Sequence, residues 1–188
     1  VERGQDYAVV ISTASGLWSY ELEDVIRFVD LVPPSVVVVG RTGQGLSAFG
    51  EHLIEAEIAE SVAASARELG LKINDYCVGT IHTTTGGHHH YLVEVADNLD
   101  SKPSPSLAEG VDRHLKSINA DYRELREGDS AIQPPVVTLT RIDGFKEWMS
   151  LRRGLGGQNK LPHVVADRDL FEDIKKISTV AAVQEGEK

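Results

Sequence analysis

Short apolar runs separated by turn residues fill the first forty positions, and this pattern predicts β-strands. The runs cover residues 7–13, 17–22, 25–31 and 35–39. The last of them contains four successive valines, which is typical of a strand buried on both faces. Residues 40–45 then hold three glycines in six positions, and this freedom of the backbone predicts a hinge.

Beyond residue 45 the apolar positions recur every three or four residues, which predicts amphipathic helices. The first such face consists of Ile54, Ile58, Val62, Ala66 and Leu69. Gly70 follows it directly and is a typical helix stop. The spacing also predicts one long helix over 107–125, and further helices over 145–153 and 170–183.

Between these helices lie segments that predict strands. Residues 71–83 and 88–96 flank a turn at 84–87 and form an expected hairpin, and 136–142 forms another strand. Because helices join the strands outside the hairpin, we expect an α+β fold with a mixed β-sheet flanked by helices. The predicted domains are a β-rich end of a larger domain at 1–39, the hinge at 40–45, an α+β domain at 46–183 and a tail at 184–188.

The net charge and the cysteine content indicate which partners and which cellular compartment to expect. The formal net charge is −10, so we expect neither nucleic acid nor an anionic membrane as a partner. Cys77 is the single cysteine, which fits a reducing compartment, and we expect a cytoplasmic protein. The chain starts at Val1 and enters a strand almost at once, so we expect that an upstream part is missing.

Two segments are candidates for binding chemistry. Lys160 lies in the glycine-containing loop 156–162, where a flexible ammonium can be delivered to a phosphate or carboxylate. Residues 20–24 combine Tyr20 with Asp24, which suits the ring and hydroxyls of a ribose. Each has a plain structural alternative: a solvated surface lysine, and acidic residues at a strand edge.

Four histidines raise a third hypothesis, a metal site. They are His82, His88, His89 and His90. Three imidazoles can hold a zinc ion, but a strand displays adjacent residues on opposite faces. Because no cysteine or carboxylate nearby completes a ligand set, we expect ordinary strand histidines and no metal.

The order of these features resembles the Gretchen-Hagen family of acyl-acid amido synthetases, within the adenylate-forming superfamily. Residues 16–25 (GLWSYELEDV) are similar to the family's G-L-Y-R-Y-R-V-G-D-V, and 39–51 resemble its hinge and the entry to its mobile domain. Gly87-His88 with Glu94 is similar to its G-H-Y…W-E strand. Residues 157–162 (GQNKLP) align with its N-Q-Y-K-x-P loop. The resemblance spans about residues 5–166, and the chain resembles bacterial members of the family most.

This resemblance implies a function and roles for single residues. Such enzymes use ATP and Mg to adenylate a carboxylic acid, and the small domain then rotates so that an amine attacks. Asp24, with Tyr20 beside it, would bind the nucleotide, Arg41 would contact ribose or phosphate, and Lys160 would be catalytic. The implied partners are the missing N-terminal adenylation domain and the carboxylic acid and amine substrates.

Departures from the family pattern keep an alternative open. Glu21 and Glu23 replace an arginine and a glycine, and acids close to a polyphosphate are unfavourable unless they face away. The phosphate loop, the acyl pocket and most of the metal site would lie upstream. We therefore expect the chain alone to be inactive and to bind no cofactor. The alternative is a non-catalytic binding or scaffold module derived from the same family.

Overall fold

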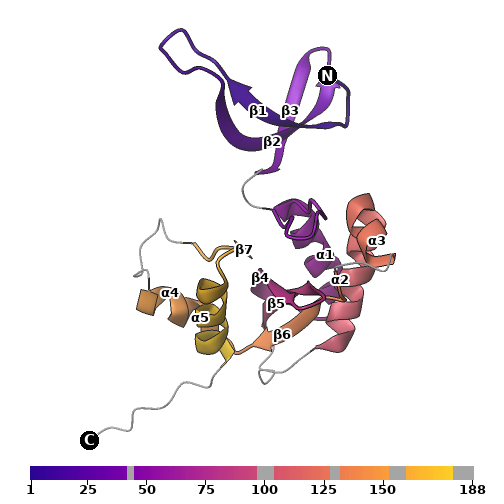
Figure 1. Ribbon diagram of the computed structural model, residues 1–188, viewed down its shortest axis with the longest axis vertical. Coiled ribbons are helices and arrows are strands. Elements are labelled where there is room, and N and C mark those ends of the chain that lie inside the picture. The colour runs from indigo at the N-terminus through magenta and orange to yellow at the C-terminus, as the bar shows by residue number, and fades with distance from the viewer. Residues whose placement is uncertain (42–44, 97–103, 128–131, 153–159, 180–188) are drawn as a thin grey trace, which may run out of the picture.

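The computed structural model describes residues 1–41, 45–96, 104–127, 132–152 and 160–179. These residues form two separate sheets, and five helices accompany the second sheet (Figure 1). Three predictions fall wholly or partly outside the described residues. They are the middle of the hinge at 42–44, the lysine loop up to residue 159, and the end of the last helix with the tail at 180–188.

The first sheet contains three antiparallel strands in the order β1-β2-β3. The strands are β1 (Asp6–Ile11), β2 (Tyr20–Leu31) and β3 (Pro34–Arg41). The two strands expected over 17–22 and 25–31 are one long strand, β2. Its pairing with β1 shifts in register between Ala8 and Val10, and this irregularity coincides with the polar break that suggested two strands.

The prediction of a doubly buried strand at 35–39 was wrong for this chain. β3 lies at an edge of its sheet, and three of its four successive valines are exposed. Val36, Val37 and Val38 are all exposed, Val38 by 67%. A run of valines predicts that both faces of a strand are buried, but the run does not indicate which part of a protein would bury them.

The second sheet is mixed and has the order β6-β5-β4-β7. Its strands are β4 (Ile73–Thr83), β5 (Gly86–Val95), β6 (Val136–Thr140) and β7 (Val164–Val165). The predicted hairpin is confirmed, because β4 and β5 pair antiparallel across a turn at Thr84 and Thr85. β6 and β7 pair parallel with their neighbours. The expected α+β class with a mixed sheet is therefore confirmed.

Helices cover both faces of this sheet (Figure 1). On one side lie α1 (Glu55–Glu68), α2 (Pro105–Ile118) and α3 (Ala120–Glu127), and on the other lie α4 (Gly144–Arg152) and α5 (Arg168–Thr179). The alternation of β5 divides its side chains between two cores. Tyr91 and Val93 pack under α1 and α2, whereas Leu92 packs with Trp148 and Phe171. The mixed sheet therefore has a hydrophobic core on each of its two faces.

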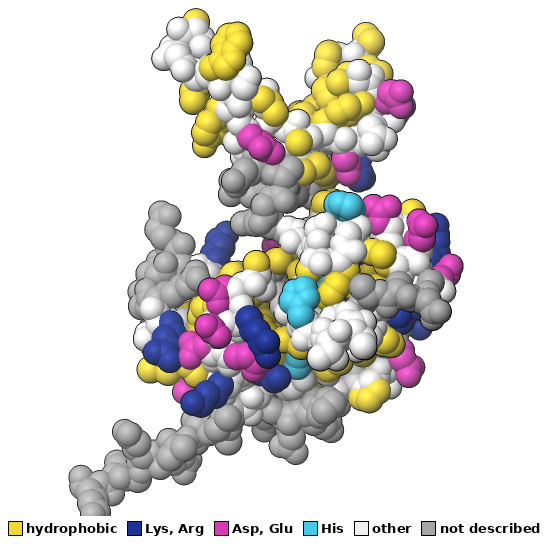
Figure 2. All heavy atoms as spheres, in the orientation of Figure 1, with side chains coloured by type: hydrophobic (Ala, Val, Ile, Leu, Met, Phe, Trp, Pro, Cys, Tyr) yellow, Lys and Arg dark blue, Asp and Glu magenta, His cyan; other side chains and the backbone are white. Residues whose placement is uncertain are grey.

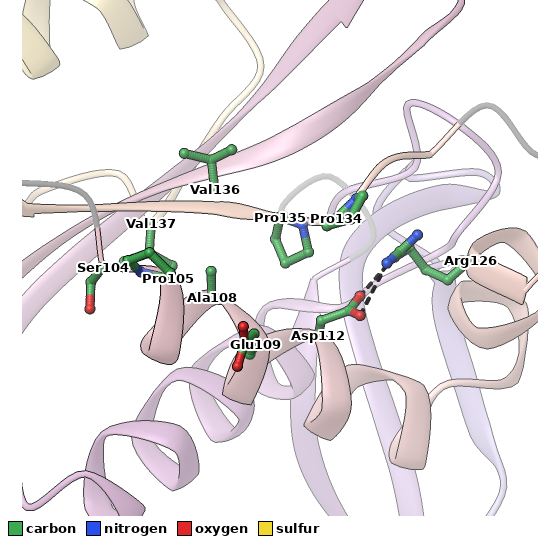
Figure 3. A pocket seen from close by; sticks show the side chains of 10 residues that line it. All are labelled: Ser104, Pro105, Ala108, Glu109, Asp112, Arg126, Pro134, Pro135, Val136 and Val137. Carbon is green, nitrogen blue, oxygen red and sulfur yellow. Dashed lines mark hydrogen bonds and ion pairs between the residues drawn. The ribbon is translucent and has the colours of Figure 1, made fainter.

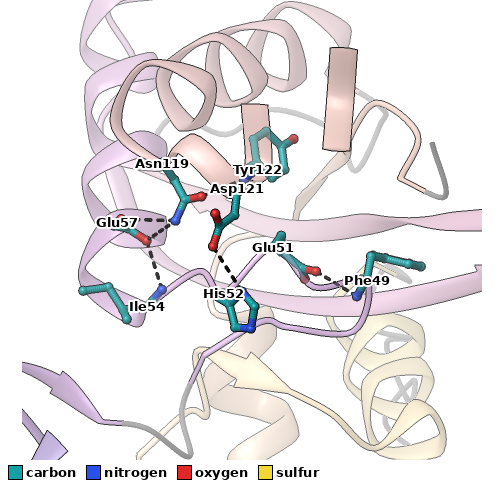
Figure 4. Close-up of polar contacts among 8 residues, drawn as sticks. All are labelled: Phe49, Glu51, His52, Ile54, Glu57, Asn119, Asp121 and Tyr122. Carbon is teal, nitrogen blue, oxygen red and sulfur yellow. Dashed lines mark hydrogen bonds and ion pairs between the residues drawn. The ribbon is translucent and has the colours of Figure 1, made fainter. Parts of the chain in front are cut away.

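The long helix expected over 107–125 is broken at Asn119. This residue has extended backbone angles, with φ of −121° and ψ of 118°, and it ends α2. Its side-chain oxygen accepts a hydrogen bond from the Tyr122 N–H at 2.7 Å, which caps the start of α3. Its amide group donates to Glu57 on α1 at 3.1 Å (Figure 4). The apolar spacing continues through the break, so periodicity alone could not reveal it.

Within the described residues, none of the helices is both long and apolar enough to cross a membrane.

Candidate functional site

The residues expected to bind a nucleotide lie on the three-stranded sheet. Asp24 on β2 and Arg41 on β3 are directly opposite each other in the register of the two strands. Tyr20, at the start of β2, lies opposite Ile11 of β1 and is half exposed. The structure thus brings Asp24 and Arg41 together at one end of β3. Tyr20 lies four residues before Asp24 on the same strand and is paired with β1 instead of β3.

Lys160 belongs to the other part of the chain. It is exposed and lies four residues before β7 of the mixed sheet. Its neighbour Leu161 is buried, 7% exposed, in the core beneath α4 and α5. The predicted loop around the lysine, residues 156–159, lies outside the described residues. Lys160 therefore marks the point where the chain returns to the mixed-sheet domain, whereas Asp24 lies on the three-stranded sheet.

The segment that follows Lys160 is held in place by His163, a histidine that the sequence analysis did not select. His163 contacts the Glu55 side chain through Nδ1 at 2.8 Å and the Asp75 side chain through Nε2 at 3.0 Å. Its ring stacks on Tyr76, with 4.7 Å between centroids and 15° between planes. The sequence offered one indication of its role: His163 lies three positions after Lys160, between a proline and two valines.

The segment that leads from the predicted hinge into α1 is held by polar contacts (Figure 4). Leu46 and Leu53 pair as an isolated antiparallel bridge. Between them, Glu51 is fully buried and accepts a hydrogen bond from the Phe49 N–H at 2.8 Å. Glu57 accepts one from the Ile54 N–H at 3.1 Å. The entry to the mixed-sheet domain is therefore packed and hydrogen-bonded rather than loose.

The histidines of the hairpin do not converge. His89 points into the core under α1 and α2, where it meets Glu51, while His90 points to the opposite face and contacts Phe171. His88 shares the face of His90, with 6.2 Å between their ring centroids, and His82 packs on Phe49. Among the described residues, no group of three or more His, Cys, Asp and Glu side chains is arranged to hold a metal.

A pocket of about 460 Å³ opens between α2, α3 and the segment that leads into β6 (Figure 3). Its lining residues are Ser104, Pro105, Ala108, Glu109, Asp112, Arg126, Pro134, Pro135, Val136 and Val137. Asp112 and Arg126 form an ion pair at 2.7 Å on its wall. Burial would raise the pKa of Asp112, but hydrogen bonds from Arg126, Lys116 and Tyr122 outweigh it and lower that pKa. None of the predicted site residues lines this pocket.

Apolar side chains gather on the surface of the three-stranded sheet (Figure 2). Trp18 is 86% exposed and Val32 is 87% exposed. Val10, Leu22, Val29 and Val38 are also exposed on the strands themselves. An exposed apolar patch of this kind usually marks a surface that another part of a protein covers.

Comparison with known proteins agrees with this architecture. The GH3 family C-terminal domain matches residues 56–169, and the GH3 family central domain matches residues 1–41. The indole-3-acetic acid-amido synthetase GH3.4 of Arabidopsis thaliana is 28% identical over 88% of this chain and 30% of its own length. The probable indole-3-acetic acid-amido synthetase GH3.9 of Oryza sativa subsp. japonica is 29% identical over 92% of this chain and 43% of its own length.

Solved structures show the same fold. The GH3.15 acyl acid amido synthetase superposes with a TM-score of 0.74 at 24% identity, over 96% of this chain and 35% of that chain. A complex of the same synthetase with 2,4-DB gives a TM-score of 0.73. The chain thus spans about a third of the length of the proteins it matches. It belongs to the GH3 family, with residues 56–169 matching that family's C-terminal domain and residues 1–41 its central domain.

Proposed function

We propose that this chain is the C-terminal, mobile part of an ATP-dependent ligase that adenylates a carboxylic acid and transfers the acyl group to an amine. The observation that carries the proposal is the position of Lys160. Its side chain is exposed where a loop returns to a rigid domain, and that domain follows directly on the sheet that bears Asp24. Residues 40–45 would act as the hinge between the two parts.

Lys160 would stabilise charge during adenylation. When a carboxylate attacks the α-phosphate of ATP, negative charge builds on the phosphate oxygens. An ammonium held in place before the reaction stabilises that charge without having to reorganise. The exposed lysine has the freedom to reach a site outside its own domain, and the buried Leu161 beside it keeps its backbone fixed.

Asp24, Tyr20 and Arg41 would hold the nucleotide from the central-domain side. A carboxylate accepts hydrogen bonds from the two ribose hydroxyls, and a half-exposed tyrosine ring offers a flat surface to the sugar or base. Asp24 and Arg41 lie opposite each other on β2 and β3, immediately before the proposed hinge. This placement would let a domain rotation change which groups face the nucleotide.

The partner that completes the site would be an N-terminal adenylation domain. The exposed apolar residues of the three-stranded sheet, with Trp18 and Val38 among them, support this proposal because the described residues leave them without cover. The acyl pocket and the phosphate loop would belong to that domain. Magnesium would also be held there, since the described residues provide no suitable group of carboxylates. We further propose a cytoplasmic protein of bacterial type.

The test uses the complete protein, with the upstream domain present. Release of pyrophosphate in the presence of ATP and a series of carboxylic acids would be compared for the wild type, Lys160→Ala and Lys72→Ala. Lys72 is an exposed lysine near the start of β4 and serves as the matched control. We expect loss of pyrophosphate release only for Lys160→Ala. If turnover were unchanged by that substitution, or absent from the wild type with every acid, the non-catalytic module would replace the ligase.

A further inference from the structure

His163 lies between two carboxylates that come from different elements. Glu55 is the first residue of α1, and Asp75 lies on β4. The ring nitrogens are 2.8 Å and 3.0 Å from their oxygens, and all three side chains are about one third exposed. Tyr76 supports the ring from one side by stacking. The three side chains therefore meet near the start of β4, where α1 begins.

This geometry requires a charged imidazole. Ionised carboxylates can only accept hydrogen bonds, and a neutral imidazole has only one N–H to donate. Both contacts of His163 are therefore hydrogen bonds only when the two nitrogens carry protons. Hydrogen bonding to Asp75 is the main cause that raises the pKa of His163; partial burial opposes this rise, and Glu55 adds to it.

The same residue ties down the backbone beside Lys160. The His163 carbonyl accepts a hydrogen bond from the Val78 N–H at 2.8 Å, and β7 begins at the next residue. Lys160 and His163 are three positions apart in the sequence, so their Cα atoms lie at most about 11 Å apart. The charged ring thus fastens the end of the lysine loop both to β4 and to the first residue of α1.

We propose that His163 is a positioning residue for Lys160, a protonated clasp that holds the end of the lysine loop against Glu55 and Asp75. The effect on catalysis rests on the proposed function of Lys160. The contacts of His163 with Glu55 and Asp75 do not depend on that function. Glu55 is also where the segment from the proposed hinge enters α1, so the clasp links the lysine loop to that segment. Substrate would not contact His163, which acts only through the backbone that it holds.

The clasp has a defined pH dependence. Glu55, Asp75 and Tyr76 are the titratable groups that face the ring. Because the pKa of His163 is raised in the folded chain, the clasp is complete below the ordinary histidine pKa of about 6.5. It is lost as the pH rises through the raised value. An arginine at this position would donate to both carboxylates at every working pH, so His163→Arg would remove the dependence.

Cleavage of the Lys160–Leu161 bond by a lysine-specific endoproteinase, which does not cut after the arginine of His163→Arg, measures the clasp in the 188-residue chain. Cleavage requires local opening, so its rate reports the population of the released loop. At pH 6 we expect His163→Phe to be cleaved about threefold to tenfold faster than the wild type, since two charge-assisted contacts are lost. The wild type should approach that rate at higher pH, and His163→Arg should stay slow. His114→Phe, which removes a histidine bonded to Glu68 alone, is the matched control.

The proposal is overturned if wild type and His163→Arg are cleaved alike at every pH. That comparison holds even if His163→Phe fails to fold. In the complete protein we expect His163→Phe to lower kcat for pyrophosphate release with little change in KM for ATP, and His163→Arg to restore it. If His163→Phe were cleaved faster at Lys160 but kept the kcat of the wild type, the role of His163 in catalysis would be contradicted. If Lys160→Ala itself left turnover unchanged, the proposed function would fail while the clasp would stand.

Discussion

Glu51 and His89 are joined inside the mixed-sheet domain by a contact of 2.8 Å between Oε1 and Nε2, and neither side chain is exposed. Glu51 belongs to the segment that enters from the proposed hinge, and His89 belongs to β5. The contact therefore attaches the entry segment to the centre of the sheet. Burial alone would raise the pKa of Glu51, but hydrogen bonds from His89 and the Phe49 N–H outweigh it and lower that pKa.

Removal of this carboxylate should destabilise the domain. Glu51→Ala leaves His89 buried without its partner, and breaking a buried polar pair costs about 3–5 kcal/mol. Chemical denaturation of the wild type and Glu51→Ala would measure the loss, with the exposed Glu60→Ala as control. Because the pKa of Glu51 is lowered on folding, its contribution is present above pH 4.5 and is lost as the pH falls below that value. A change within 0.5 kcal/mol of zero would contradict the importance of the pair.

His90 should make the chain sensitive to mild acid. Burial lowers the pKa of His90 to about 4, with help from Lys175 and His88. The unfolded chain takes up a proton near pH 6.5, before the folded chain does, so the free energy of unfolding should fall between pH 6.5 and 4. The expected loss is about 3 kcal/mol, because each pKa unit corresponds to about 1.4 kcal/mol.

His90→Gln is the matched variant for this pH dependence. Glutamine can still hydrogen-bond Thr138, which His90 contacts at 2.9 Å, but it takes up no proton. Denaturation at a series of pH values should show a shallower dependence between pH 6.5 and 4 for this variant than for the wild type. Equal slopes for the two proteins would show that His90 does not titrate as described.

Gly110 allows α2 to approach α1 closely. A Cβ atom built at Gly110 would lie 2.8 Å from Cβ of Ser65, which is closer than real Cβ contacts. Gly110→Ala should therefore cost about 1–3 kcal/mol of stability despite the better helix propensity of alanine. Ser65→Gly removes the opposing atoms, so the double variant should be more stable than the sum of the single effects predicts. Simple additivity would refute the close contact.

Prediction from sequence succeeded where a pattern acts locally. The periods of apolar residues located α1, β4 and β5 closely, and the order of motifs identified the family. Prediction failed where a residue's role depends on distant parts of the chain. Asn119 breaks a helix because Glu57 of another helix takes its amide group, and no local pattern encodes that contact. His163 was missed because its two partners lie 108 and 88 residues away in the sequence.

The candidate site illustrates the same division. Lys160 and Asp24 were chosen from motifs, and the structure places Asp24 on the three-stranded sheet and Lys160 in the mixed-sheet domain, four residues before β7. The functional relationship proposed for them would depend on a rotation between two parts and on a domain upstream, and neither can be predicted from the local sequence. The valines of β3 predicted burial on both faces, but three of them are exposed in the structure.

The 188-residue chain alone should not form an acyl-adenylate. One lysine and one aspartate cannot replace a phosphate loop and an acyl pocket, which would supply most of the binding and orientation. Incubation of the chain with ATP, magnesium and a panel of carboxylic acids should release no pyrophosphate above background. Robust release from this chain would show that the described residues contain a complete site, against the present account.

The central claim is that Lys160 acts in the adenylation step, and single-turnover kinetics of the complete protein test it most directly. Adenylate formation from acid and ATP, and amide formation from a supplied acyl-adenylate, would be measured for wild type and Lys160→Ala. Removal of one preorganised donor should slow the first step about 10²–10³-fold. The second step and the thermal unfolding midpoint should remain close to wild type, since an exposed lysine contributes little to stability. Unchanged adenylate formation, or a large fall in the unfolding midpoint together with lost activity, would contradict the claim.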